Sequence, residues 1–154
     1  MTVECPDEPS EPLHFPLLGL DISQTKIGLA IAERIDAFPQ PLYTYHRLTR
    51  ARDLAQCQDW VQRYGITGVV IGLPLNMDGT PGPRAQWMRR FTRELQEHIA
   101  TPIFLQDERL STVEAEELLL AQGVRRDERA ERVDALAAAL ILQRFLHERH
   151  EGTC

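Results

Sequence analysis

The sequence predicts an α/β fold in which a mixed five-stranded sheet, led by a β-hairpin, has helices packed on it. Three observations support this prediction. Two apolar runs separated by a short polar stretch open the domain, as in a hairpin. The run at residues 67–72 is short, apolar and rich in β-branched side chains, which is typical of a strand buried on both faces. Helix-like and strand-like segments then alternate along the rest of the chain.

The first half of the chain predicts three strands and one helix. The hairpin strands are expected at residues 17–21 and 27–33, joined by a tight polar turn. A weaker third strand is expected at residues 42–46, after a break that contains two prolines. Residues 50–63 carry apolar side chains at helical spacing, and Gly65 is expected to end that helix.

The second half predicts strands and helices in turn. After the buried strand, residues 73–83 are full of turn formers and are expected to form a loop. Residues 84–98 have the apolar spacing of a helix that packs along one side, and residues 102–105 predict a further strand.

Two helices complete the predicted fold. Ser111 followed by Glu114 predicts a capping box that opens a helix running to about residue 122, before Gly123. The last helix, rich in alanine and leucine, is expected at about residues 130–147. The resulting order is three strands, helix, strand, helix, strand and two helices, which matches the ribonuclease H-like architecture.

Length and composition predict one domain. The chain has 154 residues, and we expect a domain at residues 15–148 between a flexible, acidic, proline-rich tail at residues 1–14 and a C-terminal tail at residues 149–154. No apolar run has the length of a membrane helix and the N-terminus does not resemble a secretory signal, so a cytoplasmic location without membrane contact is expected.

The charge balance restricts the classes of function. With 17 basic and 23 acidic residues, the formal net charge is −6, which argues against a protein that coats nucleic acid by bulk positive charge. It leaves open a nucleic-acid enzyme, because a metal site built from carboxylates is itself negative. The three cysteines are far apart in the sequence, which argues against a thiolate zinc site.

Three acidic positions beside apolar segments form the candidate site, because a buried carboxylate is costly unless it is paired or holds a metal. Asp21 closes the first apolar run, where it either projects from the mouth of a strand or caps the following turn. The triplet at residues 107–109, Asp-Glu-Arg, follows a strand and either lies at the ligand-binding edge of the sheet or is a solvated loop. Asp134 lies on the helix side that is expected to pack on the sheet.

Carboxylates converging from two strand ends and a helix would form an oxygen-only ligand set. Hard divalent ions prefer such ligands, so Mg²⁺ or Mn²⁺ is the expected occupant. Two such ions bridged by a phosphodiester would support hydrolysis by in-line displacement.

The loop at residues 72–80 is a second candidate region. Its glycines, with Asn76 and Thr80 beside them, would let backbone N–H groups approach a phosphate at the start of the next helix, although a rigid strand-to-helix connection explains the pattern equally well. Arg89, Arg90 and Arg93 follow on that helix as a basic strip, for which a solvated helix face is the simpler interpretation.

Four blocks of the sequence, at residues 18–30, 70–80, 107–112 and 133–142, resemble the YqgF/RuvX family. These bacterial proteins are described as pre-16S rRNA nucleases and Holliday-junction-resolvase-like proteins, and the similarity covers about residues 16–147. The resemblance implies a ribonuclease H-like fold, a divalent-metal nuclease acting on structured RNA or branched DNA, and a role in maturing the 5′ end of 16S rRNA, with ribosomal particles as possible partners.

The resemblance also implies the roles of individual residues. It assigns the catalytic and metal-binding acids to Asp21, Glu108 and Asp134, which lie in the first, third and fourth blocks. Four further residues in the matching blocks are expected to bind substrate: Lys26, Asn76, Thr80 and Arg109.

One departure from the family lies next to Asp21. Related sequences show a Pro-Gly-Thr-Lys-Arg-like turn, whereas residues 22–26 read Ile-Ser-Gln-Thr-Lys, so a Cβ replaces a glycine where the backbone is expected to approach metal or phosphate. Lys26 is expected to supply the positive charge of the family turn.

Three alternatives remain. A non-catalytic nucleic-acid-binding factor of ribosome assembly would use the same fold, and the altered turn favours it. A nuclease for branched DNA, for which a homodimer would suit a two-fold symmetric junction, cannot be separated from an rRNA nuclease because phosphate-directed chemistry does not read bases. An ATP-binding protein of the sugar-kinase type would need two such domains, and the chain has the length of one.

Overall fold

The computed structural model describes residues 13–151 and contains a five-stranded mixed sheet with four helices in this part of the chain. The strands are β1 (Leu17–Ile22), β2 (Lys26–Ala32), β3 (Gln40–His46), β4 (Gly68–Leu73) and β5 (Ile103–Asp107). The helices are α1 (Arg50–Arg63), α2 (Pro83–Gln96), α3 (Ser111–Ala121) and α4 (Arg126–Glu151). The strand order across the sheet is β3-β2-β1-β4-β5.

The predicted hairpin is present. β1 and β2 pair antiparallel, in a register that places Asp21 opposite Gly28. The Oγ of Ser23 closes the turn, because it accepts the backbone N–H of Lys26 at 3.0 Å and donates to the Lys26 carbonyl at 3.2 Å. Among the described residues, Leu110 alone has a positive φ without being glycine, so this turn forms without the glycine of the family pattern.

The middle of the sheet is parallel. β4 pairs in parallel with β1 on one side and with β5 on the other, so the carboxyl ends of these three strands lie at the same edge. All six residues of β4 are buried, as predicted for a central strand. Asp107, the last residue of β5, and Glu108 after it are therefore brought to the edge where β1 ends, in the arrangement that positions ligand sites in α/β sheets.

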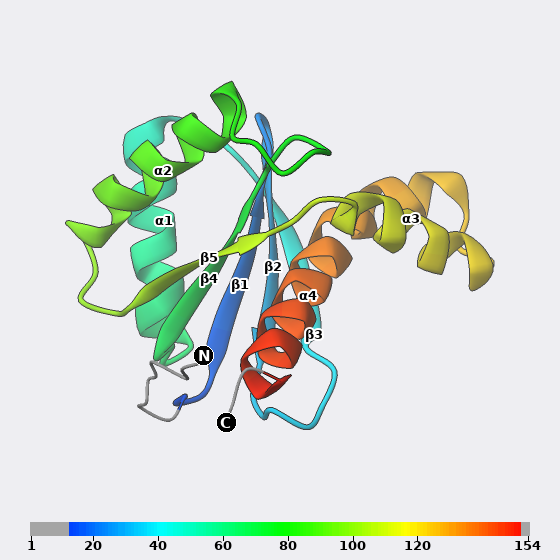
Figure 1. The fold of residues 1–154 in the computed structure, drawn as a ribbon, viewed down its shortest axis with the longest axis horizontal. Coiled ribbons are helices and arrows are strands. Elements are labelled where there is room, and N and C mark those ends of the chain that lie inside the picture. Colours follow the sequence, from blue (N-terminus) through cyan, green and yellow to red (C-terminus); the bar gives the residue numbers. More distant parts are fainter. Residues whose placement is uncertain (1–12, 152–154) are drawn as a thin grey trace.

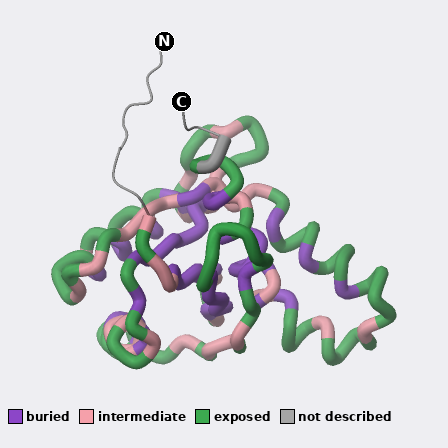
Figure 2. The backbone as a smooth tube through the Cα atoms, turned by 90° about the horizontal axis from the view of Figure 1, so that it is seen from below, coloured by how far each residue is buried: buried purple, intermediate pink, exposed green. Residues whose placement is uncertain are grey.

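Helices cover both faces of the sheet (Figure 1). α1 and α2 lie on one face and enclose a core whose largest side chains are those of Trp60 and Phe91. α4 crosses the other face, where Ala138 and Leu142 pack on β1 and β4. α3 extends away from the sheet and packs against α4. Figure 2 shows the buried stretches gathered in the centre of the molecule and on the helix sides that face it.

Successive side chains of β1 point to opposite faces of the sheet, and this decides which of them face α4. Leu18, Leu20 and Ile22 belong to the core under α1 and α2, whereas Leu17 belongs to the core under α4. Asp21 is in phase with Leu17, so its side chain points to the α4 face.

The predicted capping box is wrong. Ser111 is the first helical residue of α3 and not its N-cap; the N-cap is Leu110, at φ 70°, and it makes no side-chain capping bond. The backbone N–H of Ser111 donates to the Glu108 carbonyl at 3.0 Å in a tight turn. Glu114 does not reach back to the helix start, because its carboxylate accepts a hydrogen bond from Arg144 at 3.1 Å. A long-range contact has replaced the local one.

Several element boundaries differ from the prediction. α4 begins at Arg126 and reaches Glu151, four residues beyond the prediction at each end, so part of the expected C-terminal tail is helical. β3 begins at Gln40 and includes Pro41, which is possible because β3 is an edge strand. Residues 1–12 of the expected N-terminal tail and residues 152–154 lie outside the described part. No helix within residues 13–151 is long and apolar enough to cross a membrane.

Candidate active site

Two acids meet at the carboxyl edge of the sheet. Asp21, near the end of β1, is buried with 7% of its surface exposed. Glu108 is the first residue after β5, and its backbone N–H donates to the Leu73 carbonyl at 3.2 Å. The two carboxyl groups lie close enough that each shifts the pKa of the other.

Burial and like charge both raise the pKa of this pair. Burial is the largest cause of the raised pKa of Asp21, and the negative charges of Glu108 and Asp134 raise it further. Burial raises the pKa of Glu108 to about 7, although its contact with Asp21 and the positive charge of Arg84 oppose this. The contact between the two carboxyl groups raises the pKa of Asp21 and lowers that of Glu108.

A glycine makes room for Glu108. A Cβ on Gly72 in β4 would overlap the Oε1 atom of Glu108, so only glycine lets this carboxylate lie against the backbone. That Oε1 is buried and has no hydrogen-bond partner among the described residues. A buried carboxylate oxygen without a donor is costly, and a cation would satisfy it.

The third acid comes from α4. Gly28 lies opposite Asp21 in β2, and a Cβ there would overlap the backbone carbonyl of Asp134, so α4 contacts the sheet at this point. The Asp134 side chain is 15% exposed, and its Oδ2 lies 3.8 Å from Nζ of Lys26. Burial raises the pKa of Asp134, and the charges of Lys26 and His46 partly offset this.

The three acids fit a divalent cation in chemistry but are not yet arranged around one. Their donors are all carboxylate oxygens, which suit hard ions, and the unpartnered Oε1 of Glu108 is available. Within residues 13–151, however, no three acidic, histidine or cysteine side chains are close enough to hold a single ion as they lie. Asp21 and Glu108 contact one another, while the carboxylate of Asp134 is oriented to Lys26.

The geometry separates Glu108 from its neighbour Asp107, which residue patterns had left unresolved. Arg109 donates to Asp107 from its backbone N–H at 2.9 Å and its Nε at 2.8 Å, and its Nη2 lies 2.7 Å from the Asp107 Oδ2 in an ion pair. Burial raises the pKa of Asp107, but these bonds outweigh it and leave the pKa lowered. Asp107 is therefore a paired anion, and Glu108 is the acid that faces Asp21.

The remaining expected substrate residues are engaged within the protein. Asn76 and Thr80 bond to one another across the turn, through Nδ2 to Oγ1 at 3.0 Å and through the Asn76 N–H to the Thr80 carbonyl at 2.9 Å. Nη1 of Arg109 donates to the Met77 carbonyl at 3.0 Å, which ties this turn to the end of β5. These contacts favour the rigid-connection interpretation of the loop.

Sequence reasoning missed Arg84. This residue is at the second position of α2, its Nη2 donates to the Ile22 carbonyl at 3.2 Å, and its charge acts on Glu108. The sequence did contain a signal for Arg84. A cation in the first turn of a helix is disfavoured by the helix dipole, so its presence indicates a compensating contact.

Comparisons with known proteins identify the family of the chain. The family described as RuvX, Holliday junction resolvase, matches residues 16–148. Proteins with the curated name "Putative pre-16S rRNA nuclease" are similar over most of their length. The protein from Anaeromyxobacter dehalogenans is 45% identical over 86% of this chain and 96% of its own, and that from Rhizobium johnstonii is 42% identical over 93% of this chain and 88% of its own.

A solved structure confirms the fold. RuvC of T. thermophilus in complex with a Holliday junction substrate superimposes with a TM-score of 0.57 and 17% identity, over 90% of this chain and 97% of that one. The ribonuclease H-like architecture expected from the element order is thereby confirmed. From the family match and the curated relatives together, the chain belongs to the RuvX family, described as Holliday junction resolvases.

Proposed function

We propose that this protein is a divalent-metal-dependent endonuclease that hydrolyses phosphodiester bonds in structured nucleic acid, with a precursor of 16S rRNA as its substrate. The observation that supports this most is the buried Asp21–Glu108 pair with Asp134 beside it. The names of the relatives suggest the substrate. Since rRNA is made in the bacterial cytoplasm, the proposal includes a cytoplasmic location and contact with ribosomal particles.

Asp21, Glu108 and Asp134 would hold Mg²⁺ or Mn²⁺. Such ions, when bound, activate water and stabilise the leaving oxygen of a phosphodiester. Binding would require Asp21 and Glu108 to be deprotonated, against their raised pKa values, and Asp134 to turn from Lys26 towards them. Lys26 would then remain free at the edge of the site to bind a substrate phosphate.

Burial of the acids serves the proposed reaction in two ways. The walls around Asp21 exclude water, which strengthens every electrostatic interaction inside the site. Gly72 and Gly28 fix the approach of Glu108 and Asp134, so the acids are positioned by backbone contacts and not by flexible loops.

The test is cleavage by the full chain of a labelled RNA that contains the 5′ precursor region of 16S rRNA. We expect cleavage with Mg²⁺ or Mn²⁺, none with EDTA, and a loss of at least about 100-fold in Asp21→Asn and Asp134→Asn. Asp36→Asn is the matched control, because Asp36 is exposed and paired with Arg34 away from the site. Undiminished cleavage in EDTA or in both site variants would reject the proposal.

Branched DNA is the second candidate substrate, favoured by the description of the matching family. A four-way DNA junction in the same assay distinguishes the two, and the mass of the protein on the junction shows whether it acts as a homodimer. Binding to RNA or DNA without cleavage by either metal would instead support a non-catalytic assembly factor.

A further inference from the structure

Three arginines surround one tryptophan on the α1–α2 side of the sheet. The guanidinium carbons of Arg47, Arg84 and Arg50 lie 4.7, 5.0 and 5.3 Å from the centre of the Trp87 ring. We call these three residues the arginine fan. They come from three places in the sequence, namely the connection after β3 and the first turns of α1 and α2. Trp87 itself stacks on Phe91, with the ring centres 5.3 Å apart and the planes 11° from parallel.

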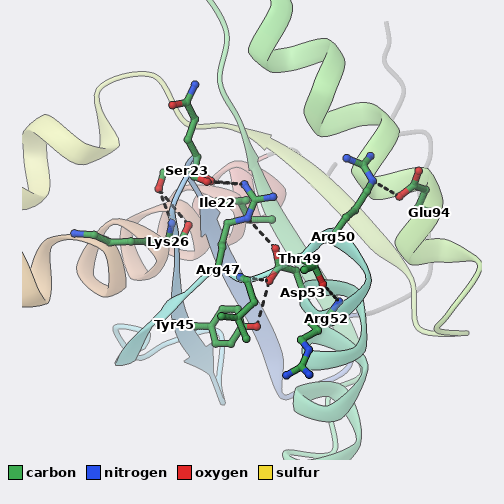
Figure 3. A network of polar contacts seen from close by, with 12 residues as sticks. Ile22, Ser23, Lys26, Tyr45, Arg47, Thr49, Arg50, Arg52, Asp53 and Glu94 are labelled. Atoms are coloured by element: carbon green, nitrogen blue, oxygen red, sulfur yellow. Dashed lines mark hydrogen bonds and ion pairs between the residues drawn. The ribbon is translucent and has the colours of Figure 1, made fainter.

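The fan is fixed to the turn that follows Asp21. Arg47 donates from Nη1 to the Ser23 carbonyl at 2.7 Å and from Nε to Asp53 at 2.9 Å (Figure 3). Its side chain is 13% exposed, and Asp53 is buried beneath it. Arg47 is therefore held in one orientation, which lowers the entropic cost of binding an anion.

The fan has more positive than negative charge. Arg47 pairs with Asp53, and Arg50 pairs with Glu94 across α1 and α2. Arg84 forms no ion pair within residues 13–151, and its Nη2 donates to the Ile22 carbonyl. Three cations against two carboxylates leave one positive charge beside a cluster of acids, in a protein whose net charge is −6.

Arg84 connects the fan to the acids. It contacts the residue directly after Asp21, and its charge acts on Glu108. The side chain of Asp21 lies on the α4 face while the fan lies on the α1–α2 face, so the two are separated by the carboxyl edge of the sheet. A nucleic-acid strand that crossed this edge would contact the acids first and the guanidinium groups next.

We propose that the arginine fan binds backbone phosphates of the nucleic-acid strand that flank the scissile phosphate, where the strand crosses the carboxyl edge of the sheet. The inference rests on the proposed nuclease function. Guanidinium groups match phosphate oxygens with a planar fork. Phe91 stacks on the indole and the arginines lie over its ring, which leaves little of it to stack on a base. The fan therefore contacts phosphate and positions the strand without selecting its sequence.

A purely structural role is the competing explanation, because the fan also joins α1, α2 and the hairpin turn. In that case, removing one guanidinium would lower the melting temperature and leave nucleic-acid affinity unchanged. The salt dependence of binding separates the two roles, since each phosphate contact adds about one to the slope of log K against log salt.

The experiment measures binding of labelled structured RNA and of a four-way DNA junction across 50–300 mM KCl. It uses the Asp21→Asn chain, in which the proposed function predicts no hydrolysis. Arg84→Gln is expected to weaken binding about 10-fold and to reduce the slope by about one. Arg63→Gln is the matched control, because Arg63 is at the other end of α1 and pairs with Asp59; it is expected to change neither quantity.

Two further variants address folding. Trp87→Leu keeps all three charges but removes the platform, so it is expected to weaken binding with little change in slope. Arg50→Gln lies at a half-exposed position and provides a second charge deletion if Arg84→Gln is unstable. Arg84→Lys is expected to restore the slope and only part of the affinity, because lysine keeps the charge and loses the fork.

The outcomes separate this inference from the nuclease proposal. If Arg84→Gln and Arg50→Gln bind with the affinity and slope of Arg63→Gln, or if no nucleic acid binds at all, the fan is not a phosphate site. If the fan variants lose affinity as expected while the otherwise unaltered protein cleaves neither RNA nor DNA, the nuclease proposal fails and the fan remains a binding site.

Discussion

Asp21 is an acid in a position that disfavours its charge. Its neighbours are two further acids and apolar core, and its pKa is raised by burial first and by Glu108 and Asp134 next. Asp21→Asn removes this unfavourable charge while keeping the shape of the side chain. We expect the variant, in EDTA at pH 8, to have a free energy of unfolding at least about 1 kcal/mol above that of the unaltered protein, measured with urea.

Divalent ions are expected to reverse the order of stability of the unaltered protein and Asp21→Asn. Added Mn²⁺ or Mg²⁺ is expected to raise the melting temperature of the unaltered chain and to leave Asp21→Asn unchanged, because only the former has its full set of anionic ligands. An equal rise in both proteins would place ion binding elsewhere.

Glu108 predicts a pH dependence of folding. Its pKa rises from the ordinary 4.5 to about 7 in the folded protein, so between these values the unfolded chain has lost a proton that the folded chain retains. The folded state binds more protons there, and the free energy of unfolding therefore falls as the pH rises from about 5 to about 7. Above about pH 7 the stabilisation from the protonated Glu108 is fully lost. Below about pH 5 Glu108 is protonated in both states, so the free energy of unfolding no longer depends on its ionisation.

Glu108→Gln provides the measurement for this effect. Urea unfolding in EDTA at several pH values should show a steeper fall with pH in the unaltered protein than in the variant, in which this position cannot ionise. Parallel curves for the two proteins would show that the pair does not titrate in this range.

For single residues, the sequence indicated which acids could belong to the site but did not decide between neighbouring acids. Asp21 and Asp134 could be singled out as acids beside apolar runs, and their role in catalysis remains a prediction. Asp107 and Glu108 could not be separated, because the difference lies in Arg109 curling back on one of them and in Gly72 making room for the other. Family resemblance assigned Glu108, and the contacts give the physical reason.

Single glycines set the distance between elements. Gly28 lets the backbone of α4 at Asp134 lie directly on β2, and a Cβ would overlap backbone atoms that cannot rotate away. Gly28→Ala is expected to lower the free energy of unfolding by about 1–3 kcal/mol and to move Asp134 away from Asp21. Urea unfolding measures the first effect, and loss of stabilisation by Mn²⁺ measures the second.

Gly68→Ala is the control for that prediction. A Cβ there would meet the end of the Leu17 side chain, which can rotate, so we expect a smaller loss of stability and unchanged response to Mn²⁺. Equal losses in both variants, with Mn²⁺ stabilisation retained in Gly28→Ala, would show that the approach of α4 does not position the acid.

Elements with strong periodicity were predicted better than their ends. The central strand β4 and the hairpin are present because their apolar runs are buried on both faces of the sheet. The start of α3 was wrong, since Glu114 is engaged with Arg144, thirty residues away. α4 exceeded its predicted length because its polar first turns are helical despite lacking an apolar pattern that would mark them.

The strand order and the arginine fan belong to the whole molecule. No local pattern states that β1 lies between β2 and β4, or that arginines from three segments converge on Trp87. The sequence suggested a different basic feature, the strip formed by Arg89, Arg90 and Arg93, and those three residues are exposed on α2. The arginines meet at Trp87 only because α1 packs against α2. That packing could not be predicted from the local patterns of the sequence.

The overall charge limits how the protein can bind nucleic acid. With a net charge of −6, attraction is confined to local basic groups, and the fan supplies at most three phosphate contacts. Three contacts predict a slope of about −2.7 for log K against log salt on duplex substrates, and hence a loss of affinity of about 40-fold between 50 and 200 mM KCl. A protein that neutralised six to ten phosphates would lose roughly 10³-fold or more over that range. Fluorescence anisotropy with the Asp21→Asn chain measures the slope, and a value near −8 would mean that a much larger basic surface than the fan contacts the substrate.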